Sequence, residues 1–363
     1  MKIAEFKVYQ YTLPLARPLV VHGLQLSTRR GMILQLISNK GEEGFGEISP
    51  LPALSKESFE IASKQILSLQ DFLTNNNVPS GIERLNGGFK KWFKNLRLVP
   101  SVQFGIEMAV LNLIANSKKV PLHKIISEEF HTNVRITGLI SGSKETVKTQ
   151  TAELLAKGFV DLKLKVGEHI EDEIEKVRIV NETINGKALL HLDANQTWDY
   201  EEAVRFGEEV GLAAMDYIEE PFRDIDRIPE FFNKTTIPVA LDETLQTLDF
   251  EKLKSVEGVD VLVLKPTVIG GIEKVWQIIQ TARNYAIDIV VSSSFESDIG
   301  LLTLVNLAGA YTSRDRAAGL DTGKWFENNL LRQNLEIKGG KIDISNRMIR
   351  SHDIHFDQLK QIL

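Results

Sequence analysis

Five ionisable side chains recur along the chain at near-regular intervals. Successive members of the set lie 23 to 28 residues apart, and each stands at the end of a short apolar segment: Lys165, Asp193, Glu219, Asp242 and Lys265. Carboxylates brought together repel one another unless a cation binds among them, and a set of oxygen ligands selects a hard ion. We therefore expect the three acids of this set to bind Mg²⁺, with Mn²⁺ as a substitute.

The lysines of the set suggest proton transfer. Lys163 and Lys165 end the segment FVDLKLK and would project from the same face of a strand. Burial and like-charge neighbours lower the pKa of a lysine and make a neutral, basic amine accessible. A proton next to a carboxylate is only weakly acidic, so its removal requires a stabilised enediolate, which a bound divalent ion provides. The pattern predicts proton abstraction alpha to the carboxylate of a small-molecule substrate.

Each of these residues also has an ordinary explanation when taken alone. A strand-end aspartate is often a helix N-cap, and the two lysines of FVDLKLK would suit an exposed sheet edge. Recurrence on five consecutive strands favours the chemical explanation. Glu220 and Glu243 each lie one residue beyond a proposed ligand, so we expect them to point away and to act as supporting groups. His191 is expected to contact substrate or to be packed, rather than to bind metal.

The elements that must position this set are predicted from about residue 133 onward, where short apolar strands alternate with amphipathic helices. Seven or eight such units over roughly 190 residues are typical of a (β/α) barrel, in which the C-terminal strand ends carry the chemistry. A weak eighth strand is expected at 319–321. A doubly wound open sheet is the alternative, but no glycine-rich phosphate loop follows the first strand.

The chain is expected to fold as α/β: a modified (β/α)7β TIM barrel with an N-terminal α+β capping domain. The predicted divisions are a capping domain at 1–120, a catalytic barrel at 121–325 and a C-terminal segment at 326–363 that returns to the capping domain. The segment LEIKGGKIDI, 335–344, is expected to form a hairpin that makes this return.

Composition limits the classes of function. The 363 residues carry a formal net charge of −6, which disfavours a nucleic-acid partner, and the chain has no cysteine for disulfides or thiolate sites. The N-terminal segment lacks the apolar run of a secretory signal, and no apolar stretch approaches the roughly 20 residues that span a bilayer. We expect a cytoplasmic protein with no membrane partner, either a monomer or a homo-oligomer.

The motifs around these residues resemble the enolase superfamily, in its muconate-lactonising-enzyme-like subgroup. KLKVG is similar to that family's K-x-K motif, LDAN, IEEP and LDET to its three metal-ligand motifs, and VLKP to the segment of its second catalytic lysine. The resemblance covers nearly the whole chain. It implies that Lys165 and Lys265 are catalytic and face each other across the substrate, with Lys163 in support. It also implies that segments 19–27 and 49–51 cap the site.

Two further stretches, SSSFESDIGL and AGLDT, resemble the o-succinylbenzoate synthase family of this superfamily. That resemblance implies a carbon–oxygen lyase (hydro-lyase) of menaquinone biosynthesis, which dehydrates 2-succinyl-6-hydroxy-2,4-cyclohexadiene-1-carboxylate. The expected substrate-binding residues are Lys163, Asn195, Ser293, Ser294 and Asp321. The alternatives are racemisation of N-succinylamino acids, dipeptide epimerisation, cycloisomerisation of muconates and a catalytically silent barrel used as a scaffold. The D-x-D of dipeptide epimerases is incomplete, because Gly323 replaces its second aspartate.

Overall fold

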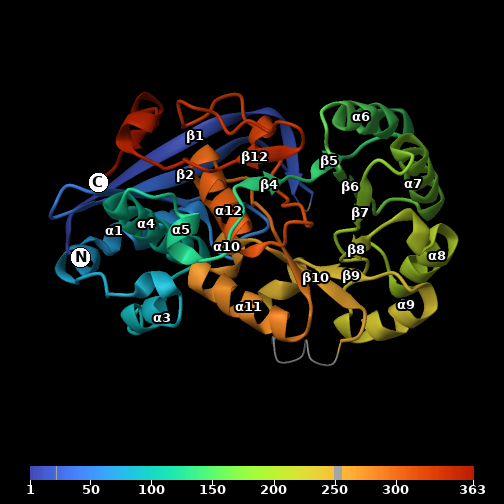
Figure 1. Ribbon diagram of the computed structural model, residues 1–363, viewed down its shortest axis with the longest axis horizontal. Coiled ribbons are helices and arrows are strands. Elements are labelled where there is room, and N and C mark those ends of the chain that lie inside the picture. The colour runs from blue at the N-terminus through green and yellow to red at the C-terminus, as the bar shows by residue number, and fades with distance from the viewer. Residues whose placement is uncertain (22, 249–255) are drawn as a thin grey trace.

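The computed structural model describes residues 1–21, 23–248 and 256–363. An antiparallel sheet occupies one side of the molecule and a parallel barrel the other (Figure 1). None of the helices in these described ranges combines the length and hydropathy that crossing a membrane requires.

The N-terminal region is an antiparallel sheet packed on helices. Its strands are β1 (Ile3–Val21), β2 (Leu24–Ser38) and β3 (Glu43–Ile48), and its helices are α1 (Phe59–Ser68), α2 (Gln70–Asn75), α3 (Gly88–Trp92) and α4 (Pro100–Lys118). Strand β3 lies directly against α4. A Cβ at Gly46 would come within 1.9 Å of the carbonyl oxygen of Gly105, so this close approach requires glycine.

A short connection leads from α4 to the barrel through α5 (His123–Ile126) and β4 (Asn133–Arg135). The barrel then alternates strands and helices. Its strands are β5 (Gly138–Ile140), β6 (Asp161–Lys165), β7 (Leu189–Asp193), β8 (Tyr217–Glu219), β9 (Val239–Leu241), β10 (Val259–Leu264) and β11 (Asp288–Val291). Its helices are α6 (Lys144–Ala156), α7 (Ile170–Ile184), α8 (Tyr200–Val210), α9 (Ile228–Thr235), α10 (Pro266–Ile269), α11 (Ile272–Asn284) and α12 (Asp298–Tyr311).

Local sequence explains where several of these helices begin. Ser143 caps α6 and Ser297 caps α12 through side-chain oxygens that accept backbone N–H bonds. Asp199 and Glu202 form a reciprocal capping box at the start of α8. These caps follow the strand ends closely, so the loops that they close at the C-terminal mouth of the barrel are short.

The seven barrel strands are parallel and hydrogen-bonded in the order β11-β10-β9-β8-β7-β6-β5. Backbone bridges join Ile136 to Ala318 and Ser292 to Gly319, both in parallel orientation. Residues 318–319 therefore fill the eighth position of the ring, between the two ends of the seven-stranded sheet. The predicted (β/α)7β barrel with an N-terminal capping domain is confirmed, and the doubly wound alternative is wrong.

The C-terminal segment contacts both parts of the molecule. Strand β12 (Lys341–Asp343) pairs with β4, next to the barrel, whereas β13 (Lys360–Gln361) pairs with β1 of the capping sheet. The expected hairpin at 335–344 is therefore wrong in its destination. The Gly339-Gly340 turn, with both residues at positive φ, directs the following strand onto β4, and the last residues make the return instead. The three-part division of the chain stays a prediction.

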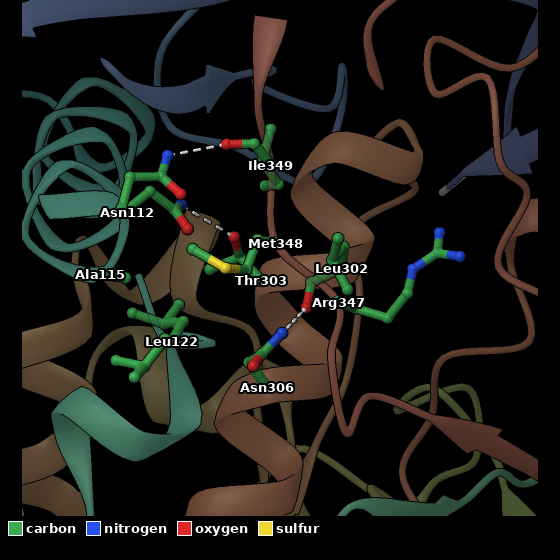
Figure 2. A pocket seen from close by; sticks show the side chains of 11 residues that line it. Asn112, Ala115, Leu122, Leu302, Thr303, Asn306, Arg347, Met348 and Ile349 are labelled. Carbon is green, nitrogen blue, oxygen red and sulfur yellow. Dashed lines mark hydrogen bonds between the residues drawn. The ribbon is translucent and has the colours of Figure 1, made fainter. Parts of the chain in front are cut away.

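Figure 2 shows where α4, α12 and residues 347–349 meet around a cavity of about 10 Å³, room for about one water molecule. The amide of Asn116 donates to the carbonyl of Ile349 at 2.8 Å, and the amide of Asn112 donates to Thr303 at 3.3 Å. These buried polar contacts tie the C-terminal segment and the barrel helix α12 to the longest capping helix.

Candidate active site

A cavity of about 490 Å³ opens at the C-terminal ends of the barrel strands. Its floor is polar and carries side chains from β6 and β7 together with that of Lys265, directly after β10, whereas Leu19, Leu51 and Leu54 of the capping domain form an apolar wall. The expected covering segments 19–27 and 49–51 thus reach the cavity through Leu19 and Leu51; residue 22 lies outside the described residues. The predicted substrate-binding residues all line this space: Lys163, Asn195, Ser293, Ser294 and Asp321.

Lys163 bridges two of the proposed metal ligands. Its ammonium lies 2.9 Å from the Asp193 carboxylate and 2.7 Å from that of Glu219. Burial acts to lower the pKa of Lys163, but the carboxylates of Asp193 and Glu219 outweigh burial and hold the pKa well above its usual value. The nearest charged neighbours of Lys163 are therefore acids, rather than the other lysines that the sequence led us to expect.

Lys265 is also paired with a carboxylate. Its ammonium donates to Asp242, and Lys265 itself directly follows β10 and precedes α10. Burial lowers the pKa of this lysine, and the carboxylates of Asp242 and Glu243 more than compensate, so the pKa is raised. The raised pKa favours the protonated form of Lys265.

Lys165 has a different environment. Its ammonium donates to the amide oxygen of Asn195 at 2.9 Å and lies 3.9 Å from Asp193. Its side chain is 47% exposed, against 18% for Lys163 and 17% for Lys265. Of the three lysines, Lys165 therefore has the weakest carboxylate contact and the most open face toward the cavity.

The three proposed metal ligands lie on adjacent strands. Asp193 and Glu219 are register partners across β7 and β8, and Asp242 directly follows β9. Burial acts to raise the pKa of Asp193, but the ammonium groups of Lys163 and Lys165 lower it to about 2. Burial and the neighbouring carboxylates of Asp193 and Asp242 hold the pKa of Glu219 well above its usual value.

In the part of the chain that the structure describes, no three His, Asp or Glu side chains converge closely enough to hold a metal ion as they stand. The donor set nevertheless fits a divalent cation. Among the described residues, the buried Glu219 Oε1 atom has no hydrogen-bond partner, and two further carboxylates stand at the ends of the neighbouring strands. A cation among these three acids would satisfy this oxygen and relieve the repulsion that raises the pKa of Glu219.

The segment after β11 forms another wall of the cavity. The Ser293 hydroxyl lies 2.8 Å from that of Thr322, and the buried Ser294 hydroxyl has no partner among the described residues. Asp321 lines the same wall, and its carboxylate accepts a hydrogen bond from Lys324. This wall therefore presents serine and threonine hydroxyl groups to the cavity, and the carboxylate of Asp321 is already paired.

Glu220 and Glu243 differ from one another. Glu220 accepts backbone N–H bonds from Asp242 at 2.7 Å and Thr244 at 2.8 Å, so it fixes the turn that follows β9. Burial raises the pKa of Glu220 to about 7.

Glu243 instead lines the cavity and accepts a hydrogen bond from Asn195 at 3.1 Å. Strand alternation would place it on the opposite face, but the chain leaves the extended conformation at Asp242, whose ψ is −80°.

His191 lies below the cavity. It is 3% exposed, stacks on Tyr217 with a centroid distance of 4.5 Å and lies between Asp161 and Asp216. Of the two expectations for this residue, the packed position is the one observed.

Comparison with known proteins agrees with this geometry. The family model for the enolase C-terminal domain-like family matches residues 146–348, and that for the MenC N-terminal domain matches residues 3–113. An o-succinylbenzoate synthase from Aliivibrio fischeri (strain ATCC 700601 / ES114) is 31% identical over 328 residues, which cover 89% of this chain and 92% of the relative.

Two solved structures show the same fold. The L-Ala-D/L-Glu epimerase from Bacillus subtilis has a TM-score of 0.84 at 22% identity, covering 94% of this chain and 96% of that one. The N-succinyl Arg/Lys racemase from Bacillus cereus ATCC 14579 also has a TM-score of 0.84, at 20% identity and full coverage of both chains. The chain is therefore an enzyme of the enolase superfamily and belongs with the o-succinylbenzoate synthases within it.

Proposed function

We propose that the protein is an o-succinylbenzoate synthase, which dehydrates 2-succinyl-6-hydroxy-2,4-cyclohexadiene-1-carboxylate. The observation that carries the proposal is the match of both domains: the curated relative named for this activity aligns with 89% of the chain. The site supplies what this chemistry needs, namely an amine open to the cavity, a second lysine held as a cation and three acids on adjacent strands.

Lys165 is the proposed base. In neutral form its amine takes the proton from the carbon alpha to the ring carboxylate, and the resulting ammonium returns that proton to the hydroxyl group leaving from the neighbouring carbon. The products are water and an aromatic ring, and aromatisation helps drive the reaction. The Asn195 amide, a neutral group, is the hydrogen-bond partner that orients this amine at 2.9 Å, whereas the Asp193 carboxylate lies farther away, at 3.9 Å.

Lys265 is proposed to stay protonated and to stabilise the enediolate formed on proton removal. The hydrogen bond from Lys265 to the Asp242 carboxylate supports this part, because a neighbouring anion favours the protonated amine. Asp193, Glu219 and Asp242 would hold Mg²⁺, which supplies electrostatic stabilisation of the substrate carboxylate when bound. The capping residues Leu19 and Leu51 exclude water from the same space.

One observation also supports a racemase. β6 and β10 stand four positions apart in a ring of eight, so Lys165 and Lys265 approach the cavity from opposite sides. Such a pair suits a two-base racemisation of an N-succinylamino acid. A dipeptide substrate is less well supported, because Asp321 is already paired with Lys324 and Gly323 replaces the second acid of D-x-D.

The two reactions are separated by a direct assay. Purified protein with Mg²⁺ is mixed with the cyclohexadiene acid, and formation of o-succinylbenzoate is followed by ultraviolet absorbance and mass. Saturable turnover supports the synthase. Failure to turn over this substrate, combined with deuterium incorporation at the alpha carbon of an N-succinylamino acid in D₂O, would assign the protein as a racemase.

A further inference from the structure

Arg29 of β2 is a fully buried cation whose side-chain hydrogen bonds, among the described residues, all go to backbone carbonyl groups. Its exposed fraction is 1%. The guanidinium donates to the carbonyls of Ser49 at 2.8 Å and Pro50 at 3.1 Å. It also donates to the carbonyls of Phe295 at 3.0 Å and Ser294 at 3.3 Å.

These four carbonyls belong to two segments that line the cavity from different domains. Ser49 and Pro50 precede Leu51, part of the apolar capping wall, while Ser294 and Phe295 lie in the barrel wall after β11. A buried charge is costly unless its donors are satisfied, and the planar fork of arginine can satisfy several carbonyls at once. Arg29 therefore joins the two walls at one point.

The barrel wall has supports of its own, because the Ser294 N–H donates to Glu296 at 2.6 Å and Phe295 packs edge-on against Trp325. Arg29 adds the contact to the capping domain at the most strained point of this wall. Phe295 has φ of +58°, a left-handed conformation that is unfavourable for a phenylalanine, and its carbonyl is directed at Arg29. A second capping residue, Glu47, accepts N–H bonds from Ser297 at 2.8 Å and Gly300 at 2.9 Å, at the start of α12. Glu47 fixes the helix, whereas Arg29 fixes the loop that carries the cavity serines.

We propose that Arg29 is a positioning residue that sets the separation of the capping wall at 49–51 and the barrel wall at 293–295, and so shapes the substrate-binding space. Arg29 makes no hydrogen bond to the two proposed catalytic lysines or to the three proposed metal ligands. Its loss should therefore impair substrate binding more than the chemical step.

The test compares Arg29→Met, Arg29→Lys and the matched control Arg30→Met. Arg30 is the next residue, but it is exposed and pairs with Glu60 at 3.2 Å on the surface. For Arg29→Met, kcat/KM should fall on the order of 10²-fold, since displaced positioning groups cost about that much, with most of the loss in KM. Arg29→Lys should lose less, because an ammonium replaces some of the carbonyl bonds. Arg30→Met should match the wild type.

Because the effect on turnover rests on the proposed function, backbone amide exchange supplies a second readout that needs no substrate. In Arg29→Met, peptides covering 292–297 and 49–51 should exchange faster while peptides of β7 keep the wild-type rate. A local change of this kind supports the proposal even if the protein has no synthase activity, a result that would refute only the proposed function.

Two outcomes overturn the role of Arg29. One is wild-type exchange in both segments with wild-type KM. The other is a uniform rise in exchange throughout the barrel, which would make Arg29 a residue of general stability. Should Arg29→Met fail to fold, the same readouts on Arg29→Lys decide between these outcomes.

Discussion

Lys165 and Lys265 reach one cavity from opposite sides of the barrel, and their partners differ in charge. The Lys265 ammonium is bonded to the Asp242 carboxylate, whereas the Lys165 ammonium is bonded to the neutral amide of Asn195. This difference in partners assigns the two lysines different tasks in the proposed reaction, one as base and one as permanent cation.

Replacing the proposed base should remove most activity without unfolding the protein. Lys165→Ala is expected to lower kcat by at least about 10²–10⁴-fold, the range that general base catalysis contributes. Steady-state kinetics on the cyclohexadiene acid measures the effect, with thermal unfolding as the check on folding. Lys187→Ala, at an exposed lysine beyond the end of α7, is the control. Unchanged kcat in Lys165→Ala would remove this residue from the mechanism.

Mg²⁺ should raise the melting temperature of the protein, because a ligand that binds only the folded state stabilises it. At about 100 times Kd the gain is about 2.7 kcal/mol. Glu219→Gln should abolish most of this gain, since the carboxylate with the unpartnered oxygen is lost. Chelation should also abolish turnover, and added Mg²⁺ should restore it. If Mg²⁺ raised the melting temperatures of the wild type and Glu219→Gln by the same amount, Glu219 would not be a metal ligand.

Glu220 is expected to act on the metal through the backbone of Asp242. Its carboxylate accepts the Asp242 N–H at 2.7 Å, so Glu220→Ala frees the turn that carries the ligand. Mg²⁺ affinity should fall about 10- to 100-fold, the usual effect of a group that orients a ligand. Calorimetric titration measures it, and Glu208→Ala at an exposed position of α8 is the control. Wild-type affinity in Glu220→Ala would show that the turn needs no such support.

Glu107 should make stability depend on pH. Burial raises its pKa from 4.5 to about 8, so the folded state keeps this side chain protonated where the unfolded chain ionises it. The stabilising contribution is complete below about pH 4.5 and is lost as pH rises to about 8. Glu107→Gln should therefore gain stability relative to wild type between about pH 5 and 8, by on the order of a few kcal/mol.

Urea unfolding at four values, about pH 5, 6, 7 and 8, measures this gain across the window in which the two states differ in protonation. The amide introduced by Glu107→Gln keeps the shape of the side chain and can accept the Glu273 N–H bond, which Glu107 now accepts at 2.8 Å. The pKa values of the buried acids Glu220 and Asp298 are also raised into this range, to about 7 and about 6. The quantity to follow is therefore the difference in the free energy of unfolding between Glu107→Gln and the wild type. If this difference in the free energy of unfolding stayed constant from about pH 5 to about pH 8, the raised pKa of Glu107 would be contradicted.

The positions at strand ends could be predicted because a repeated βα unit returns the chain to the same face of the barrel at each step. Lys165, Asp193, Glu219 and Lys265 all lie where that periodicity places them. The raised pKa values of Lys163 and Lys265 could not be predicted, because they depend on which carboxylate is nearest, as the pair of Lys265 and Asp242 shows.

The role of Arg29 and the cavity-lining position of Glu243 were not predicted from the sequence, for separate reasons. Arg29 bonds to backbone carbonyls, and the sequence carries no signal for a partner that every residue possesses. Glu243 lies where the chain leaves the strand, so the alternation of side chains that holds within β9 fails one residue beyond Asp242. Both positions depend on the tertiary path of a loop rather than on local pattern.

A crystal structure of the protein with Mg²⁺ and o-succinylbenzoate would decide whether the three acids and two lysines form one active site. We expect one ion bound by Asp193, Glu219 and Asp242. The Lys165 amine should lie close to the ring carbon that bears the carboxylate, and Lys265 should lie on the opposite face of the ring. An ion bound elsewhere, or both lysines on one face of the ring, would contradict it.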